Sequence, residues 1–182
     1  MQEMELRIIH INTDDIRRKL NNINAIKVKE ENQINNIYDF NDRRMLNAKG
    51  YARIREVKDI LNSRTLAYMT TKKLLSQEKY KIMEECEVLI DNGEEGKRIF
   101  ESLGLELIES IKKYRESYKY KNTLIEIDIN DKSYCPFPYI EIESSYEDEI
   151  IEVVSLLGYS MKDTTSKTIY EILEDDKGLK GI

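Results

Sequence analysis

The chain has 182 residues, which suits one compact domain, and apolar residues make up 40% of it, enough for a hydrophobic core. Charged residues make up 35%, and the net charge is −6. That balance argues against a broad basic face for nucleic acid, so we expect no nucleic-acid partner. The single histidine, His10, argues against a histidine-based zinc site or a Ser-His-Asp triad.

The two cysteines, Cys86 and Cys135, form no CxxC motif, so we expect free thiols in a reducing cytosol. The N-terminus is acidic and lacks an apolar leader segment, and no apolar run reaches membrane-spanning length. We therefore expect a cytoplasmic protein without membrane contact, as a monomer or a homodimer.

Residues 3–12 (EMELRIIHIN) predict the first strand. Charged and apolar residues alternate in EMELR, so Glu3, Glu5 and Arg7 share one face of it. An acid-rich face on an edge strand is commonly a solvated surface. The segment alone leaves open whether this face meets water or a ligand.

The next part of the chain predicts a helix and a hairpin. Residues 12–25 carry apolar side chains at helical spacing, with Thr13 as the expected N-cap. Residues 27–36 are polar and rich in asparagine, and they predict a loop or an irregular strand. Residues 51–57 and 65–69 alternate again and predict the two arms of a hairpin.

The second half of the chain continues the mixture of strands and helices. Residues 83–91 predict a strand, and residues 92–104 predict a short helix that ends in glycine. Further strands are predicted over 109–120, 123–129 and 139–144.

The C-terminal part predicts a helix over 145–158, which begins with a capping box at Ser145. Residues 166–173 predict a last short helix or turn. We expect residues 1–173 to form a single domain and the polar residues 174–182 to form a frayed tail.

Pairs of charged residues two positions apart recur on the predicted strands, and the residues between them are mostly apolar. Each strand then has one charged face and one apolar face, and in a sheet these join into two surfaces. The pairs are Glu3 and Glu5 with Arg7, Arg53 with Arg55, Glu85 with Glu87, Lys113 with Arg115, Glu126 with Asp128, and Glu141 with Glu143.

Two architectures fit this pattern. In one, helices cover the apolar face of an open sheet and the charged face meets water. In the other, about eight strands curl into a barrel with the charged face inside. Arginine binds phosphate through a planar fork, and carboxylates suit Mg²⁺ or Mn²⁺. Burying acids without a cation is very unfavourable, so a charged barrel implies a metal and suits a metal-chelated polyphosphate.

These segments resemble the CYTH superfamily of triphosphate tunnel enzymes. The superfamily includes class IV (CyaB-type) adenylyl cyclases, thiamine triphosphatases, inorganic tripolyphosphatases and RNA triphosphatases. EMELR is similar to the ExExK signature of its first strand, with Arg7 in place of lysine. The later segments that resemble the family, in order, are YDFNDRRMLNAKGYARIRE, EECEV, KKYRESYKY, IEIDI, YIEIE and SKTIYEIL.

The resemblance implies an α+β fold in which an eight-stranded antiparallel β-barrel, flanked by helices, encloses a charged tunnel. It implies that Arg7, Arg53, Arg55, Lys72, Lys113 and Arg115 bind a triphosphate. It implies Mg²⁺ or Mn²⁺ held by Glu3, Glu5, Glu87, Asp128, Glu141 and Glu143. It also implies catalytic roles for Glu5, Arg7 and Glu85.

The sequence departs from the family pattern beyond Arg7. A lysine of the fourth strand is expected about where Met69 stands, with Lys72 or Lys73 as substitutes. A basic residue is expected where Met83 stands, with Lys81 as a substitute. These departures bear on rate and substrate choice more than on the fold.

Three functions stay open at this point. The first is a metal-dependent triphosphatase acting on tripolyphosphate or on a small organic or nucleoside triphosphate. The second is a class IV adenylyl cyclase that converts ATP to cyclic AMP and pyrophosphate; its adenine pocket has no clear mark in the sequence. The third is a catalytically weakened nucleotide- or polyphosphate-binding module, which Arg7 and Met69 favour.

Two further side chains carry expectations of their own. Cys86 lies between Glu85 and Glu87, so we expect it on the apolar face, in the core beneath a helix. We expect Tyr170 to pack in the core, with capping of the tunnel as the alternative.

Overall fold

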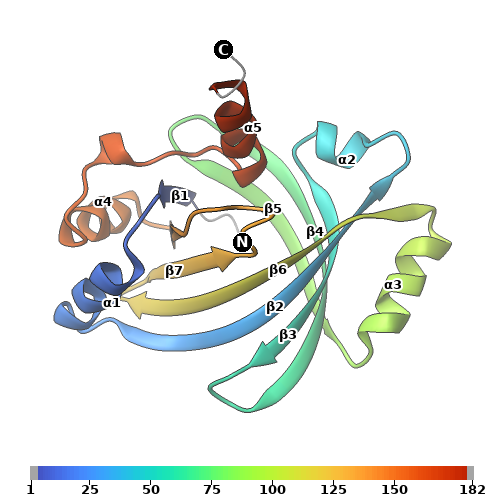
Figure 1. The fold of residues 1–182 in the computed structure, drawn as a ribbon, viewed down its shortest axis with the longest axis horizontal. Coiled ribbons are helices and arrows are strands. Elements are labelled where there is room, and N and C mark those ends of the chain that lie inside the picture. The colour runs from blue at the N-terminus through green and yellow to red at the C-terminus, as the bar shows by residue number, and fades with distance from the viewer. Residues whose placement is uncertain (1–3, 180–182) are drawn as a thin grey trace.

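The computed structural model describes residues 4–179, and in them eight antiparallel strands close into a barrel (Figure 1). The order around the barrel is β1-β5-β4-β3-β2-β6-β7-β8. The strands are β1 (Met4–Ile9), β2 (Ile26–Phe40), β3 (Tyr51–Asp59), β4 (Arg64–Gln77), β5 (Lys81–Ile90), β6 (Leu105–Tyr120), β7 (Thr123–Asn130) and β8 (Tyr139–Ser144). The predicted barrel is confirmed, and the open sheet with a solvated charged face is wrong.

The helices lie outside the barrel wall and at one of its ends. In Figure 1, α1 and α4 lie on one side, α3 on the other, and α2 and α5 at the same end. None of the helices in the described part of the chain is long and apolar enough to cross a membrane. The helices are α1 (Thr13–Asn22), α2 (Arg44–Asn47), α3 (Gly93–Ser102), α4 (Glu147–Leu156), the 3₁₀ helix η1 (Met161–Asp163) and α5 (Ile169–Leu179).

The hydrophobic core lies between the outer face of the barrel and the helices. The larger cluster joins strand residues such as Ile127 and Ile142 to Leu20 of α1 and Val153 of α4. A second cluster beneath α3 contains Phe100. Burying each aliphatic side chain contributes about 1.5–3 kcal/mol, so these outer layers hold the barrel closed.

Residues 27–36 belong to β2 along their whole length, and the β2–β6 register shifts between Lys27 and Lys29. The predicted irregular strand is therefore confirmed, and the alternative of a loop is wrong. The strand pairs with β3 on one edge and β6 on the other. Its polar residues Glu31, Gln33 and Asn35 are buried. The segment is polar because its side chains face a polar interior, which an analysis that equates burial with apolar residues misses.

Two helix ends and the C-terminal segment differ from the predictions. The N-cap of α1 is Asn12 rather than Thr13, and its side chain accepts a backbone N–H of the first turn at 3.0 Å. Helix α4 starts after Tyr146 without a side-chain cap, so the capping box at Ser145 is wrong. Helix α5 extends to Leu179, beyond the predicted short helix.

The outer faces of β4 and β5 correct two expectations. Met69 is partly buried and packs against the cluster that contains Ile54 and Phe100, so its side chain lies on the outer, apolar face. Cys86 is exposed rather than buried. Helix α3 packs mainly on β3, β4 and β6, which leaves the outer face of β5 at Cys86 open to solvent.

A buried carboxylate fastens α1 to the barrel. Glu116 of β6 is only 2% exposed, and it accepts hydrogen bonds from Arg17 Nη2 at 2.7 Å, Tyr118 Oη at 2.7 Å and Tyr114 Oη at 3.0 Å. Lys27 Nζ lies 3.1 Å from the same carboxylate. Burial alone would raise the pKa of Glu116, but these donors outweigh it and lower that pKa to about 2.

We expect Glu116→Gln to lower the free energy of unfolding at neutral pH by about 1–3 kcal/mol, because charge-assisted hydrogen bonds are lost. The folded pKa lies below the unfolded value of 4.5, so the carboxylate's stabilisation is complete above pH 4.5 and is lost as the pH falls toward about 2. Urea unfolding at several pH values measures both effects. Glu94→Gln, at an exposed carboxylate of α3, is the control and should change stability by less than about 0.5 kcal/mol. A gap between wild type and Glu116→Gln that stays constant from pH 6 to pH 3 would contradict this assignment.

We expect Met69→Lys to lower the free energy of unfolding by about 1–3 kcal/mol, because it places an amine against the apolar cluster beneath α3. Thr71→Lys is the matched control, since Thr71 follows on the same face of β4 but is exposed. Thermal unfolding compares the two variants. Equal stability of both would show that position 69 does not pack as described.

Candidate functional site

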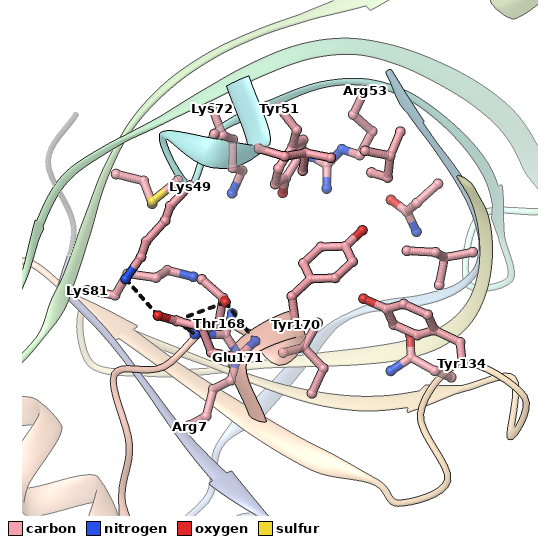
Figure 2. A pocket seen from close by; sticks show the side chains of 18 of the residues that line it. Arg7, Lys49, Tyr51, Arg53, Lys72, Lys81, Tyr134, Thr168, Tyr170 and Glu171 are labelled. Carbon is pink, nitrogen blue, oxygen red and sulfur yellow. Dashed lines mark hydrogen bonds and ion pairs between the residues drawn. The ribbon is translucent and has the colours of Figure 1, made fainter. Parts of the chain in front are cut away.

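The barrel encloses a cavity of about 470 Å³ at the end where α2 and α5 lie (Figure 2). All eight strands contribute lining residues. Its acidic lining side chains are Glu141, Glu171 and Glu174. Its basic lining side chains are Arg7, Lys49, Arg53, Lys72, Lys81 and Lys113. The basic side chains outnumber the acidic ones, so the cavity suits an anionic ligand.

Arg7 of β1 is held in place from three directions. It is 6% exposed, its Nε donates to Glu141 Oε1 at 2.9 Å, and its Nη1 donates to the backbone carbonyl of Lys167 at 2.8 Å. It also forms an ion pair with Glu5. Burial alone would lower the pKa of Arg7, but the carboxylates of Glu5 and Glu141 outweigh it and raise that pKa.

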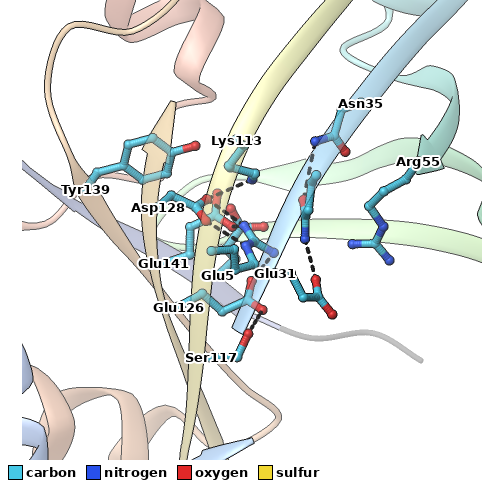
Figure 3. A network of polar contacts seen from close by, with 12 residues as sticks. Glu5, Glu31, Asn35, Arg55, Lys113, Ser117, Glu126, Asp128, Tyr139 and Glu141 are labelled. Atoms are coloured by element: carbon cyan, nitrogen blue, oxygen red, sulfur yellow. Dashed lines mark hydrogen bonds and ion pairs between the residues drawn. The ribbon is translucent and has the colours of Figure 1, made fainter. Parts of the chain in front are cut away.

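Strands β6, β7 and β8 carry a network of ion pairs in the charged interior (Figure 3). Arg115 Nε donates to Asp128 Oδ1 at 2.6 Å, and its Nη2 donates to Glu141 Oε2 at 2.8 Å. It also forms an ion pair with Glu126. Lys113 Nζ donates to Asp128 Oδ2 at 2.8 Å. Burial alone would raise the pKa of Glu141, but the surrounding cations hold it well below its usual value.

Strands β3, β4 and β5 form the facing wall. Arg55 Nη2 donates to Glu87 Oε1 at 2.8 Å, and Arg53 Nη2 lies 3.3 Å from Glu87 Oε2. Lys72 Nζ lies 2.7 Å from Glu85 Oε2. Of these, Arg53 and Lys72 line the cavity, so this wall presents cations to it and keeps its carboxylates paired.

Three of the predicted metal ligands lie in one ion-pair cluster. Arg7 joins Glu5 to Glu141, and Arg115 joins Glu141 to Asp128. Carboxylate oxygens are the donors that Mg²⁺ and Mn²⁺ prefer, so the chemistry of this set fits a divalent cation. Within residues 4–179, however, no three acidic, histidine or cysteine side chains converge on one point, because the basic residues separate them.

The other predicted metal ligands are placed differently. Glu143 lies opposite Glu5 in the β1–β8 register, next to the cluster. Glu87 lies on the facing wall with Arg53. Glu3 lies outside the described residues.

The structure shows where the lysines lie that were predicted to substitute for basic residues at Met69 and Met83. Lys72 and Lys81 both line the cavity, whereas Lys73 is exposed. Lys81 Nζ donates to Glu5 Oε1 at 2.7 Å, and burial together with the neighbouring Arg7 lowers the pKa of Lys81. Met69 lies on the outer face, so it removes no charge from the interior.

Several cavity residues were missed by the sequence analysis. Tyr51 lies two positions before Arg53 on the same strand, so both side chains share one face. Extending the alternation to Tyr51 would have predicted it inside the barrel. Burial would raise the pKa of the Tyr51 hydroxyl, but Lys72 and Arg53, with Lys81, outweigh it and lower that pKa. The lowered pKa of Tyr51 reflects a positive potential in the cavity. Lys49 lies in a loop, where no periodicity could have placed it.

Helix α5 covers this end of the barrel. Tyr170 points into the cavity (Figure 2). It therefore caps the tunnel, which was the alternative expectation, and does not pack in the core. Its ring contacts Tyr134 edge-on at 6.0 Å between centroids. Glu171 accepts hydrogen bonds from Lys49 Nζ at 2.6 Å and Gln77 Nε2 at 2.7 Å, which fastens the helix to the barrel.

Comparison with known proteins identifies solved structures of the same fold. PH1012 from Pyrococcus horikoshii is 24% identical, with a TM-score of 0.76, over 93% of this chain and 98% of that one. A proposed adenylate cyclase from Vibrio parahaemolyticus is 16% identical, with a TM-score of 0.75, over 94% of this chain and 97% of that one. HpAC1 from Hippeastrum, a proposed adenylyl cyclase with a dominant triphosphatase activity, is 14% identical, with a TM-score of 0.62, over 85% of this chain and 84% of that one.

No curated protein sequence matches the chain. The model of the CYTH domain matches residues 1–169, which is nearly the whole chain. With the closed barrel and its charged interior, this match shows that the chain belongs to the CYTH domain family.

Proposed function

We propose that this protein is a divalent-metal-dependent triphosphatase that hydrolyses a small triphosphate inside the barrel. The observation that carries the proposal is the excess of basic over acidic side chains around the cavity at one end of the barrel. Guanidinium and ammonium groups on opposite walls suit a chain of phosphates. The dominant triphosphatase activity of HpAC1 supports hydrolysis over cyclisation.

The phosphates would lie between the two walls. Arg53 and Lys72 extend from one wall, and Arg7 and Lys113 extend from the other. Lys113 lines the cavity and Arg115 does not, but both donate hydrogen bonds to Asp128. Fixed cations of this kind orient the phosphoryl group and stabilise the charge that develops in the transition state, which is most of what phosphoryl transfer needs.

Glu5, Asp128 and Glu141 would hold the divalent cation. When bound, such a cation neutralises phosphate charge and activates a water molecule for attack. Arg7 and Arg115 now donate to these carboxylates, and phosphate oxygens compete for the same donors. If the phosphates take those donors, the buried carboxylates need another cation, so triphosphate and metal would favour each other's binding.

The substrate test is an incubation with Mg²⁺ or Mn²⁺ and ATP, inorganic tripolyphosphate or thiamine triphosphate, with phosphate, pyrophosphate and cyclic AMP measured separately. We expect phosphate without cyclic AMP, and loss of turnover in EDTA that added Mg²⁺ or Mn²⁺ reverses. Cyclic AMP with pyrophosphate from ATP would establish the cyclase instead. Tight binding without any product would establish a binding module.

We expect Arg53→Ala to reduce kcat/KM about 10- to 100-fold, because a buried guanidinium that contacts phosphate is lost. Arg98→Ala is the matched control, since the Arg98 side chain is 72% exposed on α3. Steady-state kinetics measures the effect, and thermal unfolding verifies that both variants are folded. Unchanged triphosphate binding and turnover in folded Arg53→Ala would contradict a site inside the barrel.

A further inference from the structure

The charge of Arg55 is less completely neutralised than that of Arg115. Arg115 forms ion pairs with three carboxylates; burial alone would lower its pKa, but these carboxylates outweigh burial and raise that pKa. Arg55 forms an ion pair with Glu87. Burial lowers the pKa of Arg55, and the neighbouring Arg53 lowers it further. Arg55 therefore carries a positive charge that favours the approach of an anion.

The guanidinium of Arg55 also has a donor without a partner. Its Nη2 donates to the two oxygens of Glu87 at 2.8 Å and 2.9 Å, whereas its Nε is buried with no hydrogen-bond partner among the described residues. A buried donor without an acceptor costs free energy. A change of conformation that gives Arg55 Nε an acceptor would recover that free energy.

Asn35 of β2 carries a matching acceptor. It lies directly opposite Arg55 in the β2–β3 register, and side chains paired in this way start about 4.5–5.5 Å apart at their Cβ atoms. Asn35 is 5% exposed, and its Oδ1 is buried with no hydrogen-bond partner in the part of the chain that the structure describes. Figure 3 shows the Arg55 side chain beside Asn35. An unpaired donor and an unpaired acceptor therefore lie within reach of each other.

Two neighbouring side chains fix the orientation of this acceptor. Gln33 Nε2 donates to Glu31 Oε2 at 2.6 Å, so Gln33 Oε1 faces Asn35 and accepts from its Nδ2 at 3.3 Å (Figure 3). An ionised carboxylate can only accept, so Glu31 determines which way both amides point. The atom of Asn35 that remains for a further contact is the acceptor Oδ1, which suits a guanidinium donor.

We infer that a bound triphosphate draws Arg55 away from Glu87, and that Asn35 Oδ1 then accepts a hydrogen bond from Arg55 Nε. Asn35 is a positioning residue, because it acts on the phosphates through Arg55. An amide suits this task, since it accepts a hydrogen bond without neutralising the guanidinium, as a carboxylate would. The inference rests on the proposed function and adds to it a residue that orients one of its cations.

Glu87 keeps other donors when Arg55 leaves it. Thr70 Oγ1 donates to Glu87 Oε2 at 2.7 Å, and Arg53 Nη2 donates to the same oxygen at 3.3 Å. These contacts hold the carboxylate in place, so the movement of Arg55 leaves no unpaired buried charge behind. The movement exchanges one ion pair of Arg55 for a contact with phosphate and a contact with Asn35.

The test is a double-mutant cycle on the binding of inorganic tripolyphosphate, measured by calorimetry in EDTA so that the ligand is not hydrolysed. Asn35→Leu removes the acceptor, and Arg55→Lys keeps the positive charge but removes the Nε–H donor. We expect Asn35→Leu to raise Kd about five- to tenfold in the wild-type background. In the Arg55→Lys background, it should raise Kd less than about twofold, because the donor is already absent.

Arg53→Lys provides the matched background. Arg53 lies two positions before Arg55 on β3, and its Nε is also buried without a hydrogen-bond partner among the described residues, but it lies opposite Ile37 in the β2–β3 register. Asn35→Leu should therefore raise Kd by the same factor in the Arg53→Lys background as in the wild type. Thermal unfolding verifies that each variant is folded.

An equal effect of Asn35→Leu in all three backgrounds would show a merely structural role and overturn the inference. If Asn35→Leu does not fold, a crystal structure of the wild type with tripolyphosphate decides. We expect Arg55 Nε within about 3.2 Å of Asn35 Oδ1 in it, and Arg55 still bound to Glu87 would contradict the inference.

The outcomes separate this inference from the proposed function. Hydrolysis of a triphosphate without coupling between Asn35 and Arg55 overturns the inference alone. Coupling in tripolyphosphate binding without hydrolysis of any triphosphate overturns the proposed function alone. A wild-type protein that does not bind tripolyphosphate overturns both.

Discussion

The structure depends on the mutual neutralisation of charges buried inside the barrel. Asp128 is fully buried and Arg115 nearly so, and neither would be tolerated alone, because an unpaired charge in a protein interior costs several kcal/mol. Arg115 binds three carboxylates at once, and Glu141 in turn binds Arg7. Charged side chains on neighbouring strands therefore neutralise each other. The barrel closes favourably when its strands lie in the order that brings opposite charges together.

The same constraint moves the hydrophobic core outward. Because the barrel interior is polar, the apolar side chains of β1, β7 and β8 pack against α1 and α4, and those of β2 and β3 pack against α3. The apolar packing and the proposed ligand site then lie on opposite faces of the same strands. The interior can hold Asn35 Oδ1, a buried acceptor with no hydrogen-bond partner among the described residues, because the apolar packing outside the barrel offsets its cost.

The sequence predicted the barrel and its charged face because a strand alternates every two residues, so Arg53 with Arg55 and Glu85 with Glu87 had to share a face. It failed where alternation carried no apolar signal. The part of β2 at 27–36 has Val28 and Ile34 as its two apolar residues, so it was interpreted as a loop or an irregular strand. Met69 was assigned to the interior by similarity to the family, although its packing beneath α3 and the inward position of Lys72 show that it faces outward. Asn35 Nδ2 donates to Gln33 Oε1, and Gln33 Nε2 donates to Glu31, and residue spacing alone could not predict these contacts.

The exchange of lysine for arginine at position 7 illustrates how the interior compensates. Arginine keeps the charge but, unlike lysine, cannot lose its proton in a protein. In the barrel, Glu5 pairs in register with Lys81 of β5, and the carboxylate of Glu5 contacts both Arg7 and Lys81. The interior therefore keeps a primary amine beside Glu5, supplied by the neighbouring strand. Since burial and Arg7 lower the pKa of Lys81, the amine beside Glu5 loses its proton more readily than an ordinary lysine does.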